Sequence, residues 1–291
     1  MGFIRWLANI DRRIIFVVIG LAVAGPLLVP LNLPPVTVTS QARAIYDAVE
    51  ALPTGSTVLV SFDYDPAAAP EVHPMALAFL RHCFTKQHKV IIMALWPQGA
   101  QLAVRAISEI SSEFDLKYGV DYVNLGYKPG GAIVINLIGT SFAKAFPSDI
   151  NQTPLNQLPL MSKVNNLKDV AMVMDLSAGD PGIPAWVMVA NALFQRKVAG
   201  GTTAVSAPQF FPYLQSGQMM GQLGGMKGAA EYERLVKHPG LGSRGMDSQS
   251  VAHAVIIVFI IFANVAYFAL RRKTPSGGPA AAGGAPPPAA P

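Results

Sequence analysis

Two apolar stretches without a charged residue, residues 14–33 and 251–270, enclose most of this chain. An α-helix needs about 20 such residues to cross the roughly 30 Å hydrocarbon core of a membrane. Basic residues lie on the outer side of both stretches, with Arg12 and Arg13 before the first and the run at 271–273 after the second. We therefore expect two transmembrane helices with a folded region between them.

The net charge of +5 comes entirely from these flanks. Six of the 22 basic residues and one of the 17 acidic residues lie outside residues 37–249, so that region holds 16 of each sign. Because basic flanks stay in the cytoplasm, we expect a plasma-membrane protein with residues 1–13 and 271–291 cytoplasmic and 37–249 extracytoplasmic. The basic excess thus indicates topology, and we expect no nucleic-acid partner.

The first apolar stretch has a second interpretation. Arg12 and Arg13, the apolar run after them and the small residues Ala22 and Ala24 also fit a secretory signal peptide with its cleavage site. The stretch continues to residue 33 without turning polar, which favours an uncleaved signal anchor. In both cases the central region is exported, and only the number of membrane spans changes.

Two further features limit the class of protein. Residues 274–291 contain only Pro, Ala, Gly, Ser and Thr, and we expect a disordered cytoplasmic tail there. Cys83 is the single cysteine, which excludes an intrachain disulfide and a zinc ribbon. Cys83 follows His82 on an apolar helical segment, where both are expected to pack in the core.

Between the apolar stretches, strand-like and helix-like segments alternate. Short apolar runs predict five β-strands, at residues 57–62, 89–95, 121–125, 170–176 and 202–206. Helical periodicity predicts three intervening helices, at residues 70–86, 102–114 and 186–197. This alternation predicts an α/β domain with a mostly parallel, doubly wound, Rossmann-like sheet.

Two segments fit the alternation poorly. Residues 132–138 are predicted to form a helix after a glycine turn, and residues 151–159 are typical of a loop. Residues 216–236 contain Gly217, Gly221 and Gly225 at the small-xxx-small spacing of closely packed helices, with a flexible loop as the alternative.

The second apolar stretch contains one polar residue at depth, Asn264. An unpaired amide is costly in hydrocarbon, and we expect this side chain to bond to another helix.

Ligands of open α/β sheets bind beyond the carboxyl ends of the strands. The segments that follow the predicted strands are rich in carboxylates and aromatic rings. They supply these candidate ligand-binding residues: Asp63, Asp65, Trp96, Tyr127, Lys128, Asp175, Ser177 and Asp180. Together they predict a polar mouth at one edge of the sheet.

Asp63-x-Asp65 directly after an apolar strand resembles the opening motif of haloacid-dehalogenase-like phosphatases. Asp175 with Asp180 resembles the acidic metal-binding motif of the same family. The resemblance implies that Asp63 is a nucleophile, that Asp65 is the general acid/base, and that Asp63, Asp175 and Asp180 bind Mg²⁺. The chain departs from the family pattern because no Thr or Ser follows Asp65 at the usual place. The second strand also ends without the hydroxyl residue that holds phosphate.

Other catalytic patterns are missing. The sequence has no G-x-S-x-G motif around Ser177, no glycine-rich nucleotide loop and no metal-ligand spacing among its five histidines. This favours a non-enzymatic scaffold or accessory subunit without a cofactor, anchored in the lipid bilayer and bound to other membrane proteins or to copies of itself. Two alternatives remain. One is an extracytoplasmic small-ligand-binding or sensor domain, and the other is a Mg²⁺-dependent phosphohydrolase that uses Asp63 and Asp65.

Overall fold

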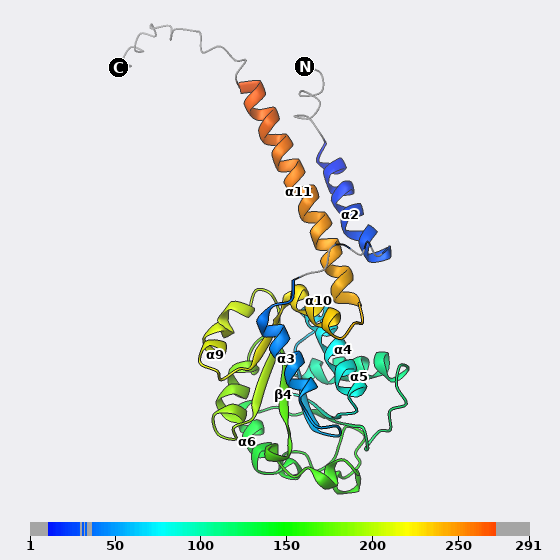
Figure 1. Ribbon diagram of the computed structural model, residues 1–291, viewed down its shortest axis with the longest axis vertical. Coiled ribbons are helices and arrows are strands. Elements are labelled where there is room, and N and C mark those ends of the chain that lie inside the picture. Colours follow the sequence, from blue (N-terminus) through cyan, green and yellow to red (C-terminus); the bar gives the residue numbers. More distant parts are fainter. Residues whose placement is uncertain (1–10, 30, 32, 34–36, 272–291) are drawn as a thin grey trace, which may run out of the picture. The chain divides into compact units, whose positions relative to one another are not determined.

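The computed structural model describes residues 11–29, 31, 33 and 37–271 (Figure 1). These residues belong to two units. One unit contains α2 (Arg12–Leu28) as far as Gly25 and α11 (Leu241–Arg271) from Ser248 onward, and the other is Pro26–Asp247. The predicted disordered tail at 274–291 and most of the predicted cytoplasmic N-terminus lie outside the described residues.

Among the described residues, only one helix is long and apolar enough to cross a membrane, namely Leu241–Ala269. The prediction of two transmembrane helices is therefore wrong for this part of the chain. α2 has 17 residues, and at 1.5 Å per residue it is about 26 Å long, shorter than a hydrocarbon core of roughly 30 Å. Pro26 in its last turn and Pro30 just beyond it explain the early end, because proline removes a helix hydrogen bond and restricts the residue before it.

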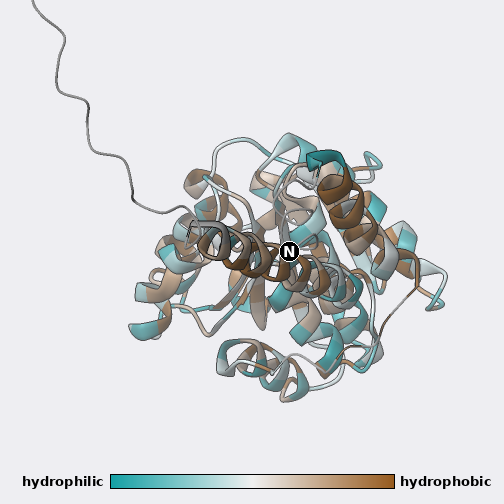
Figure 2. Ribbon diagram, turned by 90° about the horizontal axis from the view of Figure 1, so that it is seen from above, coloured by the Kyte–Doolittle hydropathy of each residue, from teal (hydrophilic) through white to brown (hydrophobic). Residues whose placement is uncertain are grey.

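α11 is continuous over 31 residues and begins ten residues before the predicted span. Within the first unit, Ser248 Oγ donates a hydrogen bond to the Val23 carbonyl, and Ala22 and Ala252 are buried. Both helices of this unit are hydrophobic over most of their length (Figure 2). Asn264 Nδ2 donates to the Ile260 carbonyl of its own helix at 2.8 Å, so the predicted bond to another helix is not found.

The second unit is built on six parallel strands in the order β3-β2-β1-β4-β5-β6. The strands are β1 (Thr57–Asp63), β2 (Lys89–Ala94), β3 (Tyr122–Tyr127), β4 (Met172–Ser177), β5 (Lys197–Thr202) and β6 (Gly221–Gly224). Strands of a parallel sheet are covered on both faces, which explains the continuous apolar runs of β1, β2 and β4. The predicted Rossmann-like α/β sheet is confirmed.

Helices cover the two faces of this sheet in two groups (Figure 1). The α4–α5 face carries α3 (Ser40–Glu50), α4 (Ala69–Thr85), α5 (Pro97–Ser111) and α10 (Gly225–Leu235). The α6–α9 face carries α6 (Ala132–Thr140), α7 (Phe142–Ala145), α8 (Ile183–Trp186), the π-helical turn η4 (Val187–Asn191) and α9 (Phe211–Gln215). Short 3₁₀ turns complete the second group: η1 (Leu155–Gln157), η2 (Met161–Lys163), η3 (Leu167–Asp169) and η5 (Ala207–Phe210).

Each face has its own core, because successive side chains of a strand point to opposite sides. Val60 and Phe62 of β1 pack toward the α4–α5 face with Phe79. Leu59 packs toward the α6–α9 face with Trp186. The residues of β1 that follow Leu59 on this second face are Ser61 and Asp63, so its core becomes polar at the carboxyl end of the strand.

Three predicted boundaries need correction. β5 begins at Lys197, so the strand predicted at 202–206 lies one strand length too late. The helix predicted at 186–197 starts earlier, at Ile183, and changes into a π-helical turn that ends at Asn191. The predicted helix after the glycine turn is present as α6, and residues 151–159 are a loop with one 3₁₀ turn.

The glycine-rich segment forms a strand and a helix, so its glycines do not share one helix face. Gly221 lies in β6, where an added Cβ would stand 2.5 Å from the Gln41 carbonyl oxygen of α3. Gly225 begins α10 at φ +60°, with a virtual Cβ 2.6 Å from Ala204 Cβ, whereas Gly217 lies in a turn with open space around it. Close packing therefore occurs at Gly221 and Gly225, but between different kinds of element.

Candidate functional site

Four polar side chains lie together in the centre of the sheet, where the strand order reverses. The β1–β4 register pairs Ser61 with Asp175 and Asp63 with Ser177, which places all four on the α6–α9 face. All four are buried. Buried carboxyl groups are costly unless hydrogen bonds or a proton compensate them, so the partners of this pair determine its charge.

Asp63 has three hydrogen-bond donors. Its Oδ1 accepts from the Leu95 backbone N–H at 2.6 Å, and its Oδ2 accepts from Ser61 Oγ at 2.7 Å and from Trp186 Nε1 at 3.2 Å. Neither carboxyl oxygen of Asp175 has a hydrogen-bond partner among the described residues.

Burial raises the pKa of both carboxyl groups, and the neighbouring Asp63 raises that of Asp175 further. The three donors favour the ionised form of Asp63, so the proton of the pair belongs on Asp175.

The burial of Asp63 bears on the phosphohydrolase interpretation. A nucleophile must reach its substrate, and Asp63 is fully covered. Asp65 Oδ1 accepts from the Ala68 N–H at 3.1 Å and caps the turn before α4. In the part of the chain that the structure describes, no three His, Cys, Asp or Glu side chains form a group suited to a metal ion. The geometry therefore adds no support to a Mg²⁺-dependent hydrolase.

A cleft of about 840 Å³ opens at the carboxyl edge of the sheet, on the α6–α9 side. Its lining comes from four parts of the chain: the ends of β2 and β3, the loop into α6, the loop after β4 with α8 and η4, and the α9 region. The lining residues are Leu95, Tyr127, Pro129, Gly130, Gly131, Ala132, Asp180, Pro181, Pro184, Ala185, Val187, Met188, Ala192, Tyr213 and Gln218. Most of them are apolar, and Asp180 is the one charged side chain among them.

The cleft and the buried aspartate pair share a wall. Leu95 lines the cleft, and its backbone N–H donates to Asp63. Ala185 also lines the cleft and precedes Trp186, whose indole N–H reaches the same carboxylate. Asp63 therefore holds hydrogen bonds from two segments that shape the cleft.

Backbone geometry explains how the loops form this opening. Gly130 and Gly131 have φ values of +128° and +50°, which side-chain-bearing residues rarely adopt, and they turn the chain sharply into α6. At the start of α6, the Ile133 N–H donates to the Gly130 carbonyl at 3.0 Å and the Ile135 N–H donates to the Gly131 carbonyl at 3.1 Å. η4 is a π-helical turn, a rare form that is frequent at functional sites, and Met188 of this turn lines the cleft.

The eight predicted site residues separate into three groups. Tyr127 and Asp180 line the cleft. Trp96 lies beside it, where its Nε1 donates to the Pro181 carbonyl at 2.8 Å and its ring lies near Gly179.

The remaining five lie elsewhere. Asp63, Asp175 and Ser177 are buried in the sheet, Asp65 caps a turn, and the Nζ atom of Lys128 lies 5.9 Å from the ring centroid of Phe146. The sequence analysis missed Met188, Ala192, Tyr213 and Gln218. The last two follow a strand end that the sequence placed too late.

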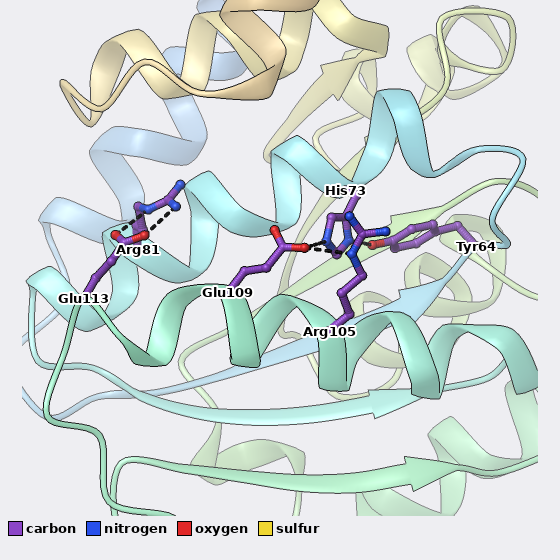
Figure 3. Close-up of polar contacts among 6 residues, drawn as sticks. All are labelled: Tyr64, His73, Arg81, Arg105, Glu109 and Glu113. Carbon is purple, nitrogen blue, oxygen red and sulfur yellow. Dashed lines mark hydrogen bonds and ion pairs between the residues drawn. The ribbon is translucent and has the colours of Figure 1, made fainter.

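A second polar group lies on the opposite face, between α4 and α5 (Figure 3). Tyr64 Oη lies 2.8 Å from His73 Nδ1, and His73 Nε2 lies 3.6 Å from Glu109 Oε1. Arg105 Nε donates to the same Glu109 oxygen at 2.7 Å. Burial lowers the pKa of His73, so it is neutral at physiological pH. Tyr64 and His73 are buried, and the group links the residue that follows β1 to α4 and α5.

Cys83 is buried in the same face, and burial raises the pKa of its thiol, so the nucleophilic thiolate is disfavoured. The expected core position of this residue is confirmed.

Comparisons with known proteins find no match: no protein family, no curated protein and no solved structure resembles this chain closely enough to be assigned. The class that the fold defines is a Rossmann-like α/β domain with a cleft at the carboxyl edge of its sheet, and one helix among the described residues is long and apolar enough to cross a membrane.

Proposed function

We propose that this protein is a membrane-anchored binding domain that holds a small, mostly apolar and uncharged molecule in the cleft. The observation that carries this proposal is the cleft itself, about 840 Å³ at the carboxyl edge of a doubly wound sheet. Open α/β sheets take their ligands at this edge, and small-molecule sites have volumes of about 300–1,000 Å³. The ligand-binding alternative of the sequence analysis is thus better supported than the hydrolase alternative.

The lining defines the ligand class. Most of the wall is apolar, so the body of the ligand is apolar as well. Tyr127, Tyr213 and Gln218 can each donate or accept a hydrogen bond. An ionised Asp180 can accept hydrogen bonds but cannot donate them. A ligand with one or two hydroxyl or amide groups fits this set better than an anion does, because Asp180 repels negative charge and no basic side chain is among the lining residues that the structure describes.

The anchor gives this site a location. α11 is followed by the basic run at 271–273, which favours a cytoplasmic C-terminus. With one crossing by α11, the domain that precedes it lies on the extracytoplasmic side. The proposed ligand is therefore taken from outside the cytoplasm.

A thermal-shift screen of the full-length chain against neutral small molecules tests the proposal. A ligand at a free concentration of 100 times its Kd stabilises the folded state by about 2.7 kcal/mol, which raises the Tm of a domain this size by about 5–10 °C. Ala192→Trp places a large ring in the cleft and should abolish the shift. Ala143→Trp is the matched control, because Ala143 is also exposed but lies in α7, outside the cleft.

The two variants separate the outcomes. Ligands that stabilise the wild type and Ala143→Trp, but not Ala192→Trp, support the cleft as the binding site. Ligands that stabilise all three proteins equally bind elsewhere and contradict the proposal. The proposal is also contradicted if no compound in the library raises the Tm of Ala143→Trp more than that of Ala192→Trp.

A further inference from the structure

The two faces of the sheet differ in charge. Residues 129–143, 181–195 and 198–226 contain no Asp, Glu, Lys or Arg, and they supply α6, α8, η4 and α9. The helices of the α4–α5 face all carry charged residues on their solvent side, among them Arg43, Arg81 and Arg105. A solvated helix normally carries charge, so these segments are unusual for a surface exposed to water. The charged residues of the same face lie on α7, η2 and η3, and they are Lys144, Lys163, Lys168 and Asp169.

Large apolar side chains are exposed on these uncharged segments. Ile133 is 71% exposed and Leu137 is 36% exposed on α6, while Met188 in η4 and Leu193 just after it are 57% and 65% exposed. We call these four residues the apolar rim. α6 and the end of the π-helical segment pack directly, because the ring of Phe194 occupies the space where a Cβ of Gly139 would lie. Single exposed hydrophobic residues are ordinary, but a group of this kind marks an interaction surface.

We propose that a second copy of this chain covers the apolar rim, with the two rims facing each other across a two-fold axis. Such an axis brings each surface against itself, so any charge on the surface meets a like charge near the axis. The rim avoids this repulsion because the segments that form it have no charged residue. Anchoring by α11 also places all copies in one membrane, which raises their effective concentration.

The composition of the rim disfavours the lipid surface as its occupant. Segments that lie at a membrane interface carry Lys or Arg for the lipid headgroups and Trp or Tyr at the boundary. The rim contains none of these residue types. Met188 belongs to both the rim and the cleft wall, so a second copy narrows the opening of the cleft. The interface itself is independent of whether the cleft binds a ligand.

Cysteine crosslinking of the full-length chain in native membranes tests this interface. The single native thiol, Cys83, is wholly buried, so only an introduced cysteine reacts with a short bis-maleimide. Met188→Cys and Leu193→Cys should each give a covalent dimer of twice the monomer mass. Val104→Cys is the matched control, because Val104 is 49% exposed but lies on α5 of the opposite face. We expect dimer from the rim positions and little or none from the control, because a two-fold interface brings the same positions of both copies together.

A second substitution shows whether the dimer depends on the rim. Leu193→Asp places a charge of the same sign on both copies and should remove most of the dimer that Met188→Cys forms. Val104→Asp should leave that dimer unchanged. Equal dimer from Val104→Cys, or monomer only from both rim cysteines, overturns the proposal.

Two other outcomes also overturn it. Products of a different mass from the rim cysteines mean that another protein covers the rim. A fluorescent label at Leu193→Cys that brominated lipids quench means that the bilayer covers it.

Discussion

The two faces of the sheet are completed in different ways. On the α4–α5 face, charged and aromatic side chains of neighbouring helices satisfy one another, as in the two-pronged Arg81–Glu113 ion pair with both distances at 2.6 Å (Figure 3). On the α6–α9 face, the aspartate pair lies inward, and the exposed side chains of α6 and η4 include the large apolar residues Ile133, Leu137 and Met188. The first face needs only water as its neighbour. The second has a cleft and an apolar rim that leave it suited to binding.

Histidines of α4 illustrate the first pattern twice. His73 lies between Tyr64 and Glu109, and His82 lies between Tyr232 Oη at 2.8 Å and Glu50 Oε1 at 3.0 Å. Each group links α4 to its neighbours, with α5 in the first case and with α3 and α10 in the second. Burial lowers the pKa of both histidines, so they serve as neutral hydrogen-bonding partners in the core.

The largest expected effect comes from removing the indole that covers the aspartate pair. Trp186→Ala deletes a fully buried ring and the N–H donor of Asp63, and should lower the free energy of unfolding by about 3–5 kcal/mol. Urea unfolding measures the change. Phe211→Ala on the same face should cost less than about 0.5 kcal/mol, because Phe211 is 47% exposed. Similar losses of unfolding free energy in both variants would mean that the stabilisation by the Trp186 ring does not come from its burial.

The ionisation of Asp175 gives the α6–α9 face a characteristic dependence on pH. Its pKa is raised by burial and by Asp63, so the protonated acid is the favoured form in the folded state. The resulting stability is present below the ordinary pKa of Asp, 3.8, and is lost as the pH rises through the higher value in the folded protein. Asp175→Asn cannot ionise and should become more stable than wild type with rising pH, by on the order of 1–3 kcal/mol.

Denaturant unfolding between pH 4 and pH 8 measures this difference, with Asp180→Asn, an exposed carboxylate, as the control. If the unfolding free energies of wild type and Asp175→Asn change with pH in the same way, the aspartate pair does not hold a proton between pH 4 and pH 8.

Glu50 on the α4–α5 face should show the opposite dependence. Hydrogen bonds from Lys86 and His82 lower its pKa from 4.5 to about 2. Its contribution is therefore present above pH 4.5 and is lost as the pH falls toward 2. The side chain is 35% exposed, so solvent screening limits the loss in Glu50→Gln to about 0.5–1 kcal/mol at pH 7. Unfolding curves of wild type and Glu50→Gln at pH 7 and pH 2.5 check this. A difference in unfolding free energy between the two proteins that grows as the pH falls would contradict the prediction.

The smallest effect should come from the partly exposed Arg81–Glu113 ion pair. Arg81→Ala removes the pairing with Glu113 and should cost about 0.2–1 kcal/mol, and the cost should shrink in high salt because mobile ions screen the charges. Melting temperatures at low and high ionic strength provide the measurement. A salt-independent loss would point to the packing of the Arg81 stem as the source of the stability.

The sheet was largely predictable because its inner strands are continuous apolar runs. TVLVSF and KVIIMA bury nearly every side chain, and such runs are typical of parallel strands. β5 and β6 differ because KVAGGT and GQLG contain glycine, which lowers strand propensity. Their place in the sheet depends on packing against α3 and α10, which no local pattern expresses.

The site was predictable only where a side chain directly follows a strand. Tyr127 ends β3 and Asp180 lies in the loop after β4, and both reach the cleft. Asp63 ends β1 and Asp175 lies within β4, but residue parity directs both side chains to the α6–α9 face, where they are buried and the Trp186 indole donates to Asp63. Met188 enters the cleft from a π-helical turn, a local rearrangement that helical periodicity does not reveal.

The pairing of β1 with β4 determines when the domain can fold during synthesis. Val58 pairs with Met172, about 110 residues later in the chain, whereas its other neighbour, β2, follows after one helix. At 5–20 residues per second, the second edge of β1 waits roughly 5–20 s for its partner to emerge. During that time an apolar strand edge is open to strands of other chains. This edge of β1 therefore stays unpaired until β4, which ends at Ser177, has been made.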